Sequence, residues 1–122
     1  MSDAQALELS KTRPAKRARR TSADRLRDAI LTLSDHRAQV IAQSERAWAS
    51  ITFAGARHVF TLIFAGDEAV EAGERFVANL PEHEFALSGH LVADATVSEV
   101  EHRMVPSPRM IVTCEVLMLE EG

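Results

Sequence analysis

Two runs of alternating apolar and polar residues, separated by one turn signal, constrain the fold more than any other feature. They occupy residues 47–64 and flank the tetrapeptide Ala54-Gly55-Ala56-Arg57. Glycine at the first position of a two-residue loop is typical of a type II′ turn, so the pattern predicts a β-hairpin with Gly55-Ala56 at its tip. Because side chains alternate along a strand, one face of this hairpin is almost wholly apolar. The predicted cross-strand pairs are Phe53–His58, Ile51–Phe60, Ala49–Leu62 and Ala47–Phe64.

The opposite face of the hairpin carries a tryptophan among β-branched and polar residues. A tryptophan beside apolar β-branched side chains on an otherwise polar surface is typical of a partner interface. We therefore expect self-association as a homodimer, through this face or through the edge of the last strand. The alternative is that another part of the chain covers the face and makes it core. The candidate interface residues are Trp48, Ser50, Thr52, Val59, Thr61 and Ile63.

Helical periodicity predicts one helix before this hairpin and one after it. The first helix is expected over residues 23–34, behind a capping hydroxyl from Thr21 or Ser22. The second is expected over residues 67–79, where a proline two positions later ends it. Gly73 lies on the apolar side of the second helix, which predicts a close contact with the sheet at that position.

The last third of the chain predicts a second hairpin. Residues 91–104 alternate but change phase, and a β-bulge near Ser98-Glu99 restores their apolar side chains to one face. Pro106-Ser107-Pro108 is a turn, and residues 110–118 form a regular apolar row. The pattern leaves open whether residues 38–43 extend the first strand or pair separately.

The element order is therefore α-β-β-α-β-β. An isolated hairpin is only marginally stable in water, so we expect both hairpins to join in one mostly antiparallel sheet. Both helices then cover the same apolar face. The predicted fold class is α+β, a two-layer sandwich over residues 21–122.

The charge distribution separates the first 20 residues from the rest. Residues 1–20 hold six Lys or Arg and two Asp or Glu, a balance of +4, whereas residues 21–122 have a balance of −8. This composition predicts a disordered basic N-terminal arm attached to an acidic domain. Nucleic-acid association through the arm is an alternative function, although the arm lacks aromatic residues for base stacking. The candidate phosphate contacts are Lys16, Arg17, Arg19 and Arg20.

A pocket between a helix and the sheet is the third possibility, for a small enzyme or a ligand-binding protein. Its candidate lining residues are Arg57, His58, His83 and His90. The sequence contains neither HExxH nor CxxC spacing, so no metal and no other cofactor is predicted. It also contains no phosphate loop or nucleophile elbow, and no catalytic residue is predicted. Cys114 lies within an apolar row, which predicts an inert buried thiol.

The leading hypothesis is a small non-enzymatic interaction protein in the cytoplasm. The longest apolar run, residues 59–65, is far shorter than the roughly 20 residues that cross a bilayer. The first 20 residues do not resemble a secretory signal, and a single cysteine fits a reducing compartment. No membrane contact is expected.

Overall fold

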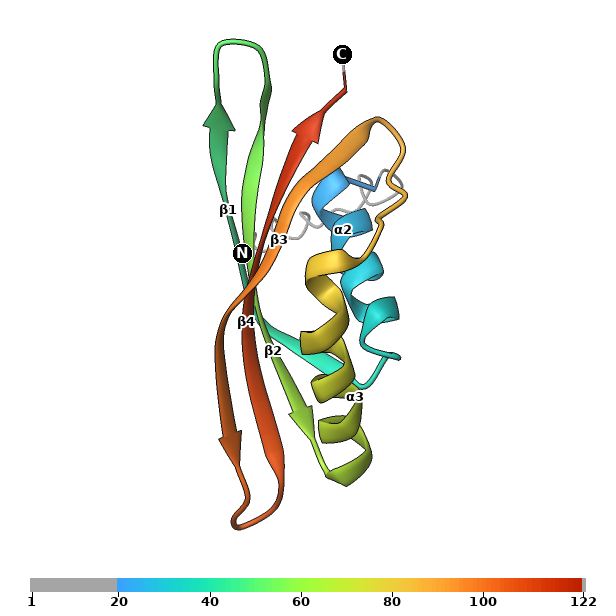
Figure 1. The fold of residues 1–122 in the computed structure, drawn as a ribbon, viewed down its shortest axis with the longest axis vertical. Coiled ribbons are helices and arrows are strands. Elements are labelled where there is room, and N and C mark those ends of the chain that lie inside the picture. Colours follow the sequence, from blue (N-terminus) through green and yellow to red (C-terminus); the bar gives the residue numbers. More distant parts are fainter. Residues whose placement is uncertain (1–19, 122) are drawn as a thin grey trace, which may run out of the picture.

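A four-stranded antiparallel sheet with two helices on one face forms the structure (Figure 1). The computed structural model describes residues 20–121. A short 3-10 helix, η3 (Leu80–Glu82), follows the second main helix. The predicted α+β class and element order are confirmed. In chain order the main elements are α2 (Ser22–Leu33), β1 (Ala38–Ala49), β2 (Ala54–Ala65), α3 (Asp67–Asn79), β3 (His90–Arg103) and β4 (Arg109–Glu120).

Helix α2 begins with a complete capping box. The Thr21 hydroxyl accepts a hydrogen bond of 3.0 Å from the Asp24 backbone N–H, and the Asp24 carboxylate accepts one of 3.1 Å from the Thr21 N–H. These bonds satisfy two helix-end donors and lower the pKa of Asp24. Further along the helix, Leu26 and Ile30 are fully buried against the sheet. The predicted cap and apolar stripe are both confirmed.

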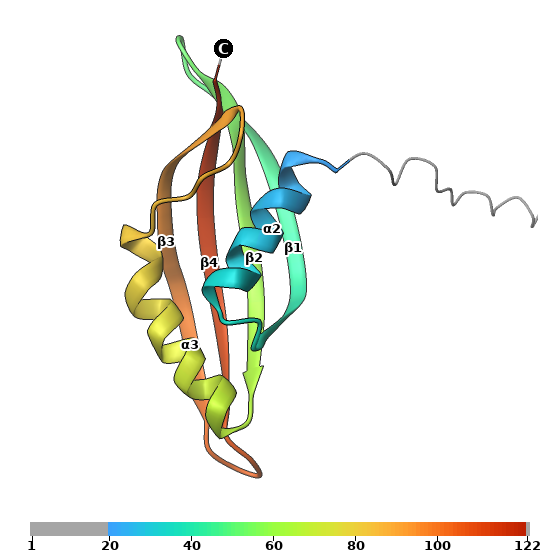
Figure 2. The same cartoon turned by 90° about the vertical axis from the view of Figure 1, so that its right-hand side faces the viewer.

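Helix α3 approaches the sheet closely at Gly73, as predicted. A Cβ atom at this position would lie 2.9 Å from the Met110 sulfur and 3.0 Å from the Phe64 ring. Any larger residue would push these core side chains aside. In Figure 2 both helices run along the same face of the sheet.

The strand order is β1-β2-β4-β3, so β2 and β4 form the centre of the sheet. Their helix-facing side chains supply most of the core. Cys114 is one of them: it is fully buried as predicted, and burial raises the pKa of its thiol to about 12. The central core residues are Phe60, Leu62 and Phe64 from β2 and Val112, Cys114 and Val116 from β4.

The predicted register of the first hairpin is wrong. Ala49 pairs with Ala54, and the turn comprises residues 50–53 instead of Gly55-Ala56. Ser50 closes this turn: its N–H donates to the Phe53 carbonyl at 2.8 Å, and its hydroxyl accepts from the Phe53 N–H at 3.1 Å. None of the pairs Phe53–His58, Ile51–Phe60, Ala49–Leu62 and Ala47–Phe64 is present.

Gly55 lies inside β2 because of the neighbouring strand β4. A Cβ atom on Gly55 would overlap the Met118 carbonyl oxygen and lie 2.8 Å from the Leu119 Cα. The glycine therefore permits a close approach between β2 and β4. Glycine inside a strand often marks such a close approach of another backbone, whereas the sequence pattern predicts a turn at Gly55.

The edge strands contain irregularities. The predicted bulge near Ser98-Glu99 is confirmed by a register shift between Val97 and Glu99. Two further shifts occur, between residues 40 and 42 of β1 and between residues 92 and 94 of β3. Residues 38–43 belong to β1, which settles the question that the sequence left open. No helix among residues 20–121 has the length and hydropathy to cross a bilayer.

We predict that Gly55→Ala lowers the free energy of unfolding by about 1–3 kcal/mol, because the added methyl forces β2 and β4 apart. Chemical denaturation measures this change. Ala47→Gly is the control: Ala47 lies exposed on the neighbouring strand β1, and its replacement should cost about 1 kcal/mol or less. Equal losses in the two variants would contradict the close-approach role of Gly55.

Candidate functional site

The sheet face that carries neither helix is the larger of two candidate sites. We call it the open face. The register places Trp48, Gly55, Leu119 and Leu91 in one row across all four strands. Because Gly55 has no side chain, Trp48 and Leu119 are the neighbouring side chains in this row. Leu119 is only 7% exposed, whereas Leu91 at the sheet edge is 50% exposed.

The remainder of the open face mixes polar and apolar side chains. Near its centre the Arg57 guanidinium lies 3.9 Å from the Glu115 carboxylate, and both side chains are about one-third exposed. Towards the other end Ile63 of β2 pairs with Ile111 of β4, and both are half-buried. Such a mixture of apolar groups and paired charges is common in protein interfaces.

The structure places most of the candidate interface residues together. Trp48, Val59, Thr61 and Ile63 share the open face, and Trp48 lies on the side opposite Phe60. Ser50 and Thr52 do not lie on this face, since they belong to the β1–β2 turn. Both described helices cover the other side of the sheet (Figure 2).

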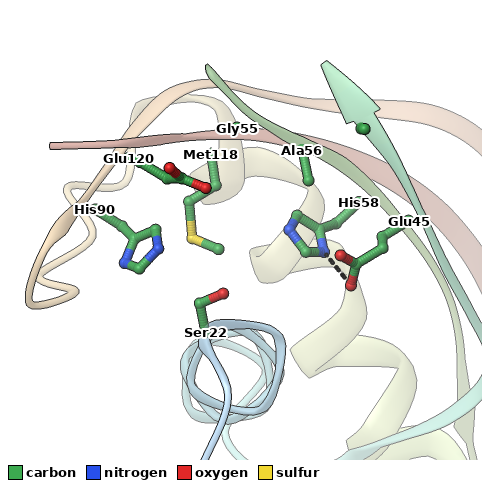
Figure 3. Close-up of a pocket in the computed structure, with 9 residues that line it drawn as sticks. Ser22, Glu45, Gly55, Ala56, His58, His90, Met118 and Glu120 are labelled. Atoms are coloured by element: carbon green, nitrogen blue, oxygen red, sulfur yellow. Dashed lines mark ion pairs between the residues drawn. The ribbon is translucent and has the colours of Figure 1, made fainter. Parts of the chain in front are cut away.

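The second candidate site is a pocket of about 180 Å³ at the N-terminal end of α2. It lies on the helix-covered side of the sheet, where the strands continue past the start of the helix (Figure 3). Strands β1, β2, β3 and β4 all contribute to it. Its lining residues are Ser22, Glu45, Ala47, Gly55, Ala56, His58, His90, Met118 and Glu120.

His58 is the most unusual of these residues. Its side chain is 1% exposed, yet neither ring nitrogen has a hydrogen-bond partner among residues 20–121. The ring stacks on Phe60, and its Nδ1 lies 3.8 Å from the Glu45 carboxylate. Burial lowers the pKa of His58, and the nearby Glu45 only partly opposes this effect. The imidazole is therefore neutral at neutral pH.

His90 faces His58 across the pocket. Its Nδ1 lies 3.2 Å from the Ser88 carbonyl, which can only accept, so Nδ1 is the donor of this hydrogen bond. In Figure 3 the Met118 thioether lies between the two imidazoles, and the Glu120 carboxylate lies on the same side as His90.

The structure brings together two of the four candidate pocket residues. His58 and His90 line the same pocket. Arg57 lies on the open face, and His83 lies in a separate depression between α2 and α3. The sequence did not predict Glu45, because this residue lies outside the predicted hairpin of residues 47–64.

The described part of the chain contains no group of three His, Cys, Asp or Glu side chains that could hold a metal ion. Of the candidate phosphate contacts, Lys16, Arg17 and Arg19 lie outside the described residues. Arg20 forms an ion pair with Asp28 and donates to the Asp24 carbonyl at 3.3 Å, so its guanidinium is held against α2.

No protein-family model matches the sequence, and the comparison with curated proteins yields no match. A chain in the solved virion of a native gene transfer agent (GTA) particle has a similar fold. The TM-score is 0.51 at 16% sequence identity, and the match covers 82% of this chain and 92% of that chain. At this identity the similarity concerns the fold alone.

We predict that His58→Phe raises the free energy of unfolding by about 1 kcal/mol or more at neutral pH, because it removes a buried polar group without partners and preserves the ring stack. In the wild type, the unfolded state binds a proton more readily than the folded state below pH 6.5, the ordinary value for histidine. Wild-type stability should therefore fall as the pH drops below 6.5, by at most about 1.4 kcal/mol per pH unit for this group.

Denaturant titrations over a pH series measure both effects. The decline below pH 6.5 should be shallower in His58→Phe than in the wild type. An unchanged slope would show that His58 is not the group responsible.

Proposed function

We propose that this protein is a structural assembly subunit, which acts by binding other protein subunits, including copies of itself, through the open face of its sheet. The observation that carries the proposal is the row from Trp48 to Leu91 on a sheet face without a helical layer. A two-layer protein normally covers only one face of its sheet, and the other is then polar. Here the face that carries neither of the described helices holds an indole, three leucines and an isoleucine pair.

The face is a better candidate for contact than the sheet edges. β1 and β3 are long edge strands of 12 and 14 residues, and such edges readily pair with other chains. Both contain register shifts, however, and bulges of this kind interrupt the regular ladder that a second strand would need. These features favour association through side chains of the open face over strand addition at an edge.

The only cysteine does not support a catalytic role. The Cys114 thiol is fully buried and its pKa of about 12 keeps it protonated at neutral pH, so it is a poor nucleophile. It contributes packing volume between the sheet and the helices.

The structural neighbour is consistent with an assembly role. It is a chain of a virion, which is a particle built from many protein subunits. The neighbour therefore supports the proposal that this chain is one structural component of a larger particle.

We predict that the protein self-associates at micromolar concentration and that Val59→Arg weakens this association at least tenfold, which corresponds to about 1.4 kcal/mol. Val59 is half-buried at the middle of the open face, so an arginine there places a long charged side chain where a second subunit would pack. Sedimentation velocity over a concentration series measures the dissociation constant.

Ala78→Arg is the matched control. It adds the same charge at an exposed position of α3, on the other layer, and should leave the dissociation constant unchanged. Circular dichroism confirms that both variants are folded. A wild-type protein that stays monomeric, or equal effects from both variants, would contradict self-association through this face.

A further inference from the structure

We propose that the pocket at the N-terminal end of α2 binds a basic side chain, preferably arginine, presented by another protein subunit. The inference that another protein subunit supplies this side chain rests on the proposed assembly function. The affinity of the pocket for a guanidinium group is independent of that function and has its own test.

The lining of the pocket is acidic and polar. Glu45 and Glu120 supply carboxylates, Ser22 supplies a hydroxyl, and His90 supplies an imidazole. Among the described residues that line the pocket, none is lysine or arginine. A pocket of acceptors with two negative charges selects a ligand that is positive and donates hydrogen bonds.

The buried imidazole of His58 lacks a hydrogen-bond partner in the described part of the chain. Its Nδ1 faces Glu45 at 3.8 Å, which favours the proton on Nδ1 and leaves Nε2 as an acceptor without a donor. An unpaired buried polar group costs about 1–3 kcal/mol, and a phenylalanine could stack on Phe60 in its place. A donor that enters beside His58 would supply the missing partner. Buried polar groups that lack a hydrogen-bond partner are often found at binding sites.

The size and spacing of the lining groups favour a guanidinium over other cations. The acidic and histidine side chains are not grouped closely enough to hold a metal ion in the described part of the chain. A volume of about 180 Å³ far exceeds the roughly 10–15 Å³ needed by one water molecule. A guanidinium carries five N–H donors in a plane and pairs with carboxylates through two bonds at once, which suits dispersed acceptors better than a compact ammonium.

The positive end of α2 opposes a cation in this pocket, but the effect is small. A helix end contributes about 0.3–1 kcal/mol, and it falls off within one turn. The Asp24 carboxylate in the capping box lies at that end and offsets the partial positive charge. The two carboxylates of the pocket therefore make its electrostatic potential negative.

The test uses N-acetyl-arginine amide as the probe and the full chain as the protein. NMR of the imidazole C–H groups follows His58 and His90 during titration. The probe should shift both signals saturably with a weak dissociation constant, and added salt should weaken binding. N-acetyl-glutamine amide and inorganic phosphate should leave the signals unchanged.

Variants separate the pocket from the rest of the surface. Glu45→Gln and Glu120→Gln should each weaken probe binding roughly two- to fivefold, as expected for partly exposed ion pairs. His58→Phe should weaken binding although the variant is more stable than the wild type, so loss of folding cannot explain the result. Glu74→Gln, at an exposed position of α3, is the control and should bind the probe like the wild type.

Three outcomes would overturn the inference: no saturable shift with the arginine probe, an equal shift with phosphate or the neutral amide, or unaltered affinity in both glutamine variants. If the probe binds, sedimentation velocity of the glutamine variants identifies the source. Weaker self-association points to a second copy of this chain, and unchanged self-association points to a different protein. Probe binding together with normal self-association of Val59→Arg would contradict the open-face proposal but not the pocket.

Discussion

The pairing of β2 with β4 is the constraint on which the rest of the structure depends. These strands bring two apolar rows together under the helices, and every fully buried side chain of the sheet other than His58 belongs to those rows. At Gly55 only a hydrogen atom fits beside the β4 backbone. β1 pairs with β2 from Ala54 to Phe64, so the chain turns before Gly55. The open face, the pocket and the hairpin turn all follow from this central pair.

The sequence predicted the parts of the fold that local signals determine. The hydroxyl of Thr21 marks a helix start, and the capping box with Asp24 confirms it. The second helix begins at Asp67 as predicted, although its N-cap Gly66 provides no side-chain cap. The strand order could not be predicted, because it depends on contacts between β2 and β4 that are about 50 residues apart along the chain. The register of the first hairpin failed for a related reason. Gly55 suits both a tight turn and a close strand contact, and only the partner strand distinguishes the two.

The wrong register nevertheless left four of the six candidate interface residues on the open face. His58 pairs with Glu45 instead of Phe53, and both positions are odd, so the error is an even number of residues and the residues within the strands keep their faces, whereas Ser50 and Thr52 lie in the turn. Trp48 therefore lies opposite Phe60, as the alternation indicates. The pocket could not be predicted from the sequence. Its members come from four strands and one helix, and Glu45 reaches His58 only because β1 begins well before the predicted hairpin.

The two hairpins extend past the helices at opposite ends of the sheet (Figure 1), and their tips expose different apolar groups: Ile51 and Phe53 at one end, Met104 and Val105 at the other. The two ends of the molecule therefore differ in shape and in the side chains that they expose. Two copies joined through identical open faces satisfy a two-fold axis and stop at that number. A contact between unlike tips has no such limit, because each added copy presents a fresh end, and such growth closes into a ring or continues as a filament. If both kinds of surface bind other copies, one chain would combine a contact that ends an assembly with a contact that extends it.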